Sequence, residues 1–216
     1  MDSYSKGYID ALVDAQSHID GYFFLEESLS PALLDAMQKV CPITPNQDGA
    51  ETLAYVYSHY FLGRRATALA RIDLLNKISQ NFDVTVYTHA DCKDILPTAI
   101  YGGRIDYYDT MPTVFQHSKI NLNITLKTIQ TGIPLRAWDI LGCGGFLLTN
   151  FQQELCDFFI PGEDFVYYES PADAIEKAAY FLSHDRERQE IAHNAFEKIA
   201  ASHTFHHRVQ SMFDII

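Results

Sequence analysis

The sequence predicts an α/β fold in which a parallel sheet follows an N-terminal helical extension. Three observations support this prediction. Residues 1–80 show apolar side chains at helical spacing, whereas from residue 81 short β-branched and aromatic runs alternate with helical segments. The chain has 216 residues, of which 47% are hydrophobic and 20% charged, so it can bury a core. Alternating strands and helices are typical of βαβ units, whose parallel sheet is covered on both faces.

The first 80 residues carry helix signals. Ile9 and Val13 lie on one face of an expected first helix. Ser30 followed by Pro31 is an N-cap residue followed by proline at the first helical position. Apolar residues recur at helical spacing again between residues 69 and 78. We therefore expect two regions, a helical lead-in over residues 1–80 and an α/β domain over residues 81–216.

The spacing of apolar residues changes from a helical to a strand-like pattern at residue 81. The expected strands, in order, are FDVTVYTH, IDYY, KINLNIT, FLLT and DFVYY. The expected helices, in order, are MPTVFQHS, PLRAWDILG, FQQELCDFF, SPADAIEKAAYFL, DRERQEIAHNAFEKIAA and a last segment near the C-terminus. Ser170 and Pro171 repeat the cap-and-proline signal at the start of the fourth of these helices.

Bulk charge and cysteine usage exclude several classes of function. The formal net charge is −12, and nucleic acid and anionic membranes both require a basic face, so neither is expected as a partner. No apolar stretch is long enough for a membrane span. The four cysteines are far apart and the N-terminus lacks a signal-peptide pattern, so we expect a cytoplasmic protein with free thiols.

A glycine cluster at residues 142–145 is the first candidate for a ligand cradle. Phosphate-binding glycines follow a strand and open a helix, whereas these follow a helix and precede a strand. We therefore interpret them as a helix C-cap and a tight turn. The chain contains no G-x-G-x-x-G or G-K-[ST] pattern, which disfavours a nicotinamide oxidoreductase or a P-loop enzyme.

The other end of that helix is a better candidate. Residues 131–134 form an expected turn with Pro134 at the first helical position, and free amides at a helix N-terminus attract anions. Arg136 adds a cation that can bind an anion with two hydrogen bonds, and Lys127 lies just upstream. Asp139 could accept hydrogen bonds from a sugar. An equally good interpretation makes Arg136 and Asp139 a local pair on the helix surface.

Five separated motifs resemble those of one enzyme family. They are GIPLRAWDILGCGGFLLTN, FIPGED, SPAD, HDRERQEIA and HTFHHR. Their order and spacing, over roughly residues 80–213, resemble the C-terminal half of bacterial family-1-like glycosyltransferases of the GT-B fold, including the CgeB-like group. The resemblance implies a Rossmann-like domain that binds a nucleotide-sugar donor, linked to UDP or GDP, without a metal or another cofactor.

The resemblance also implies roles for individual residues. Asp139 matches the second member of an acidic pair and would bind the ribose, whereas the first member falls at Thr131, which is not acidic. Arg136 and Lys127 would bind the diphosphate. The full set of candidate donor-binding residues is Tyr108, Asn123, Lys127, Thr131, Gly132, Ile133, Arg136 and Asp139.

What the sequence lacks defines the competing interpretation. A complete GT-B enzyme has two Rossmann-like domains, and the N-terminal one binds the acceptor, so the resemblance implies a missing domain and an unknown acceptor. The alternative is a non-catalytic Rossmann-like nucleotide-binding or scaffold module. Three histidines, His203, His206 and His207, lie close together in sequence, but without a paired Cys or carboxylate motif we expect no metal site.

Overall fold

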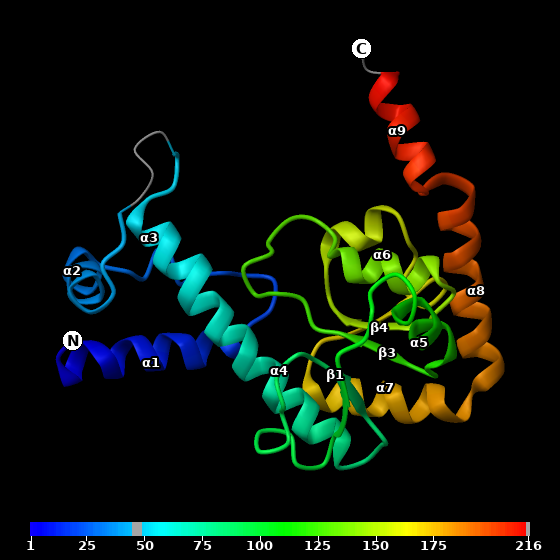
Figure 1. The fold of residues 1–216 in the computed structure, drawn as a ribbon, viewed down its shortest axis with the longest axis horizontal. Coiled ribbons are helices and arrows are strands. Elements are labelled where there is room, and N and C mark those ends of the chain that lie inside the picture. The colour runs from blue at the N-terminus through cyan, green and yellow to red at the C-terminus, as the bar shows by residue number, and fades with distance from the viewer. Residues whose placement is uncertain (45–48, 215–216) are drawn as a thin grey trace. The chain divides into compact units, whose positions relative to one another are not determined.

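The computed structural model describes residues 1–44 and 49–214. The chain divides into two compact units (Figure 1). Unit 1 comprises Met1–Leu74 and Thr125–Gln130, and unit 2 comprises Leu75–Ile124 and Thr131–Ile216. Helix α4 (Gly63–Ser79) runs across the break between them, so the domain boundary expected at residue 80 stays a prediction.

Unit 1 is helical, as its sequence pattern predicts. It contains α1 (Ser3–Ser17), α2 (Pro31–Val40), α3 (Leu53–Tyr55), the π-helix η1 (Val56–Leu62) and the first part of α4. The Ser30 hydroxyl accepts a hydrogen bond from the Leu33 amide at 3.4 Å, which confirms the predicted cap of α2. Apolar side chains of α1, α2, η1 and α4 share one core, and its buried members are Ile9, Val13, Leu25, Leu29, Leu33, Met37, Tyr57, Leu62 and Ala66.

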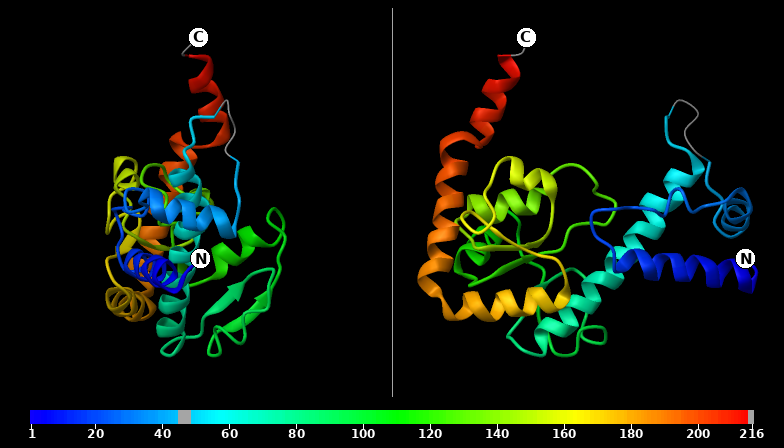
Figure 2. Two further views of the ribbon diagram at one scale, coloured as in Figure 1. Left: turned by 90° about the vertical axis from the view of Figure 1, so that its left-hand side faces the viewer. Right: turned by 180° about the vertical axis from the view of Figure 1, so that it is seen from behind.

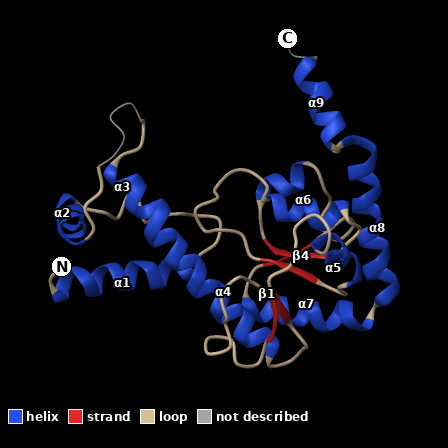
Figure 3. Cartoon of the chain, viewed as in Figure 1, coloured by secondary structure: helices blue, strands red, loops and turns tan. Residues whose placement is uncertain are grey.

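Unit 2 contains two short parallel sheets (Figure 3). Strand β1 (Thr85–Tyr87) pairs with β2 (Ile100–Gly103) in the first sheet. The second has the order β3-β4-β5, with β3 (Asn121–Asn123), β4 (Leu147–Asn150) and β5 (Val166–Tyr168). The predicted class, α/β with parallel strands and an N-terminal helical region, is therefore confirmed, although the strands form two separate sheets.

The prediction of a strand at residues 105–108 is wrong. The second strand ends at Gly103, and residues 107–110 form a turn. The Asp106 carboxylate accepts hydrogen bonds from the backbone amides of Tyr108 and Asp109, both at 2.8 Å. An aspartate that bonds to nearby amides in this way favours a turn over an extended strand.

Helices cover both faces of the three-stranded sheet. The helices of unit 2 after β2 are α5 (Met111–His117), α6 (Leu135–Gly142), the 3-10 helix η2 (Gln153–Asp157), α7 (Pro171–Ser183), α8 (Asp185–Ser202) and α9 (Phe205–Phe213). Leu147 lies in a core with residues of α6 and α8, whereas the ring of its neighbour Phe146 lies 4.8 Å from that of Phe181 in α7. Because adjacent strand residues face opposite sides, α6 and α7 lie on opposite faces, as Figures 1 and 2 show.

The glycine cluster ends α6, as predicted. The Gly144 amide donates to the Leu141 carbonyl at 3.0 Å, and the Gly145 amide donates to the Ile140 carbonyl at 2.9 Å. Gly144 has φ +74°, a conformation that favours glycine. These bonds satisfy carbonyls at the end of the helix and start the turn into β4.

Candidate functional site

The first turn of α6 and the loop before it form the candidate site. Pro134 is the N-cap residue, one position earlier than the sequence suggested, and α6 begins at Leu135. A proline side chain has no polar atom, so it cannot satisfy the free amides of the first turn. Those amides carry the positive end of the helix dipole. Arg136 is exposed in the same turn and adds its own positive charge.

Asp139, one turn into α6, is bonded to a tyrosine. The Tyr107 hydroxyl donates a 2.8 Å hydrogen bond to its carboxylate. This bond, together with burial, raises the pKa of Tyr107, while the nearby charge of Arg136 acts in the opposite direction. Tyr107, Arg136 and Asp139 are therefore electrostatically coupled. Tyr108 presents an 83% exposed side chain, and its ring lies edge-on to that of Tyr107 at 5.1 Å.

The loop before α6 is held by a glutamate that the sequence did not reveal. The Gly132 amide donates to the carboxylate of Glu154, which lies in η2 after strand β4. Thr131 is exposed, and Ile133 packs against the core of unit 2. Glu154 lies in the segment that follows strand β4, and this is the signal that could have pointed to it, because ligands of open α/β sheets bind beyond the carboxyl ends of the strands.

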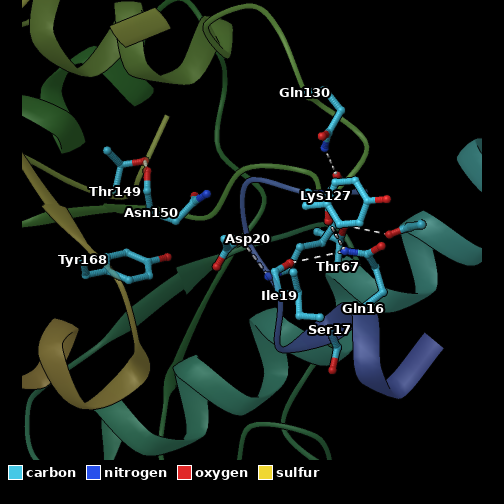
Figure 4. Close-up of polar contacts among 12 residues, drawn as sticks. Gln16, Ser17, Ile19, Asp20, Thr67, Lys127, Gln130, Thr149, Asn150 and Tyr168 are labelled. Atoms are coloured by element: carbon cyan, nitrogen blue, oxygen red, sulfur yellow. Dashed lines mark hydrogen bonds and ion pairs between the residues drawn. The ribbon is translucent and has the colours of Figure 1, made fainter. Parts of the chain in front are cut away.

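Polar side chains lie buried at the carboxyl ends of β3, β4 and β5. The Asn123 side-chain amide donates to the Thr149 hydroxyl at 3.0 Å, and the Tyr168 hydroxyl donates to the Asn123 carbonyl at 3.3 Å. Asn150 is also buried here (Figure 4). Asn123 was a predicted candidate, whereas Thr149 and Asn150 were missed. The feature of the sequence that could have indicated them is the pair of polar residues at the end of the apolar strand LLTN.

Lys127 belongs to unit 1, whereas the other candidate residues belong to unit 2. Its ammonium lies 2.7 Å from the carboxylate of Asp20, and its side chain is only 5% exposed. Its backbone amide donates to the Thr67 hydroxyl at 3.0 Å (Figure 4). Lys127 thus links the segment Thr125–Gln130 to Asp20 and Thr67, which belong to the N-terminal part of unit 1.

Two negative findings concern the described residues. Within residues 1–44 and 49–214, no three His, Cys, Asp or Glu side chains come together in a way that could hold a metal ion. Over the same ranges, every helix is too short or too polar to cross a membrane.

Comparison with known protein families identifies the chain over most of its length. Residues 64–214 match the protein family described as glycosyl transferase-like. No curated protein matches the sequence significantly. The family match covers more than half of the chain and includes the loop before α6, α6 itself and the glycine turn. The chain therefore belongs to the glycosyl transferase-like family.

Proposed function

We propose that this chain binds the nucleotide-diphosphate sugar donor of a glycosyl transfer reaction, at the loop of residues 131–134 and the first turn of α6. The observation that supports this most is the grouping of Arg136, Asp139 and Tyr107 at an uncapped helix N-terminus. It combines a cation with a carboxylate that already accepts a hydroxyl hydrogen bond, as an anionic, hydroxyl-rich ligand requires.

Each group has a chemical role in this proposal. Glycosyl transfer leaves negative charge on the departing diphosphate, which Arg136 and the amides of the first turn would stabilise. Asp139 would accept hydrogen bonds from the ribose hydroxyls in exchange for, or beside, that of Tyr107. Tyr108 would stack on the base. Lys127 has no part in the proposal, because its ammonium is paired with Asp20.

The acceptor site and any catalytic base are proposed to come from a second domain. The carboxylates placed at the candidate site are Asp139 and Glu154, and each already accepts a hydrogen bond from the chain itself. The proposed reaction is therefore still glycosyl transfer, and the proposed role of the described residues is to bind the donor.

Calorimetric titration tests the proposal. UDP, GDP and their sugars would be titrated into the wild type, Arg136→Ala and Arg186→Ala, the last being an exposed arginine of α8 that serves as a matched control. We expect Arg136→Ala to weaken binding by about tenfold or more, because it removes a charge-assisted contact, and Arg186→Ala to leave it unchanged. If no nucleotide diphosphate binds even at about millimolar concentration, the proposal fails.

The competing function is a nucleotide-binding module without catalysis. Thr131 favours it, because a carboxylate is absent at the position where the resembled enzymes have one. Binding of a nucleotide sugar without hydrolysis or transfer, measured by release of the nucleotide over hours, would support this second function.

A further inference from the structure

An aromatic cluster joins the C-terminal segment to α6. His203 follows the last residue of α8, and its ring centroid lies 5.4 Å from that of Trp138, 5.4 Å from that of Phe158 and 6.1 Å from that of Phe159. Trp138 belongs to α6 and packs against the core of unit 2. The imidazole therefore lies beside the indole, tilted by 54° from it, and this indole belongs to the helix that carries Arg136.

Arg208 of α9 closes the same cluster. Its guanidinium carbon lies 5.4 Å from the ring centroid of Trp138 and 5.6 Å from that of Phe158. Its Nη2 atom lies 3.0 Å from Nδ1 of His203. A guanidinium can only donate hydrogen bonds, so Nδ1 must accept and His203 must be neutral in this arrangement. Within the nine residues of α9, Phe205–Phe213, none is buried, and Arg208 contacts Trp138, Phe158 and His203.

Protonation of His203 would oppose the cluster in two ways. It removes the acceptor for Arg208, and it places an imidazolium beside a guanidinium. Burial, Arg208 and His207 each lower the pKa of His203 below its ordinary value near 6.5. Because the folded pKa is depressed, the contribution to stability is present above pH 6.5 and is lost as pH falls through the lower, folded value.

The position of Trp138 connects this cluster to the proposed donor site. Trp138 lies between Arg136 and Asp139 in the first two turns of α6. The helix starts after Pro134 without a side-chain cap, and Trp138 is the residue next to Asp139 that packs against the core of unit 2. Figure 2 shows α9 continuing past the end of α8. The two residues that contact Trp138 from this part of the chain, His203 and Arg208, are thus far from it in sequence.

We propose that His203 and Arg208 are positioning residues for the donor site: they clamp Trp138, orient Arg136 and Asp139, and release them when His203 is protonated. The link to donor binding rests on the proposed function above. The clamp itself is a property of the fold that can be measured without any ligand.

Tryptophan emission reports the clamp directly, because Trp138 is the single tryptophan of the chain. Emission would be followed from about pH 8 to about pH 5 in the wild type, in His203→Gln, whose amide still accepts from Arg208 but does not titrate, and in His206→Gln, an exposed control on α9. We expect a step with its midpoint below pH 6.5 in the wild type and in His206→Gln, and none in His203→Gln. A flat wild-type profile, or a step that survives in His203→Gln, overturns the clamp.

A second variant tests the role of the arginine. In Arg208→Gln the cation that depresses protonation is gone, so the midpoint should move up towards 6.5. A merely structural arginine would leave the midpoint unchanged. This measurement remains informative if His203→Gln folds poorly.

Donor affinity then tests the positioning. The affinity of the wild type for UDP should fall about tenfold more between pH 8 and pH 5 than that of His203→Gln, while the phosphate of the ligand titrates equally in both. An equal fall in both proteins, together with an intact emission step, refutes positioning and leaves the clamp. If neither UDP, GDP nor their sugars bind at any pH, the proposed function is refuted and the emission result stands.

Discussion

The two ends of helix α6 differ in packing and in polarity. At the C-terminal end the amides of Cys143, Gly144 and Gly145 all donate to carbonyls of α6. A Cβ atom on Gly145 would lie 2.7 Å from Nδ2 of Asn121. At the N-terminal end Pro134 offers no cap, and Leu135 is 74% exposed.

This difference separates the structural role of the helix from its proposed binding role. At the glycine-rich end the amides of residues 143–145 are all bonded within the chain, and the backbone of Gly145 is tightly packed. The proline end has free donors and an exposed cation. Substitutions at the first end should therefore change stability, and those at the second should change mainly ligand binding and local order.

Gly145→Ala should have the largest effect. The new Cβ would lie 2.7 Å from the Asn121 side chain and 2.8 Å from the Phe115 carbonyl, and such overpacking costs about 3 kcal/mol of the free energy of unfolding. Urea denaturation measures this loss. Gly142→Ala is the control, because its Cβ would meet Ile199 at an ordinary 3.7 Å. Equal stability of the two variants would show that the closed end is not tightly packed.

Gly144→Ala should lower the free energy of unfolding by less than Gly145→Ala. Nothing lies within 4 Å of the new Cβ, but φ at this residue is +74°, and a left-handed conformation costs a residue with a side chain about 1–2 kcal/mol. Gly144→Asn should lose less than Gly144→Ala, because asparagine tolerates this conformation better. Thermal unfolding compares the two, and the reverse order would contradict the assigned cause.

Glu154→Ala should loosen the loop at the proline end. The Gly132 amide would lose its carboxylate partner, at a cost of about 1 kcal/mol because water can replace it at this exposed position. Hydrogen exchange at the Gly132 amide should accelerate. Glu154→Gln keeps an acceptor oxygen and should lie between the wild type and Glu154→Ala. Unchanged exchange in the alanine variant would mean that another group holds the loop.

Tyr107→Phe should alter the stability profile at alkaline pH. The pKa of Tyr107 is raised above its ordinary 10.0, mainly by the hydrogen bond to Asp139. Its contribution is therefore complete below pH 10 and is lost as pH rises through the raised value. The stability advantage of the wild type over Tyr107→Phe should shrink above pH 10, as measured by urea denaturation at several pH values. The same series on Tyr108→Phe serves as the control.

Leu135→Ala should have the smallest effect. Because the side chain is 74% exposed at the open end of α6, its truncation should change the free energy of unfolding by less than about 0.5 kcal/mol. A loss several times larger, measured by urea denaturation, would mean that this end is packed against something and would weaken the contrast between the two ends.

The sequence predicted what depends on local pattern. The Ser30–Pro31 start of α2, the glycine end of α6 and the alternation of strands and helices all follow from neighbouring residues. Contacts between distant residues were not predictable. The carboxylate partner of Lys127 is Asp20, 107 positions earlier, and that of the Gly132 amide is Glu154, 22 positions later. No pattern in the sequence signals either pair, since each depends on how separate elements pack.

The segment Thr125–Gln130 limits how the protein can be divided. A shortened chain that begins at residue 81 would keep this segment but lose the rest of unit 1. Lys127 would then lose both the carboxylate of Asp20 and the hydroxyl of Thr67. A chimaera that exchanges halves with a related chain should therefore transfer residues 125–130 together with the N-terminal helices. The contacts of this segment are with unit 1, although it lies within unit 2 in the sequence.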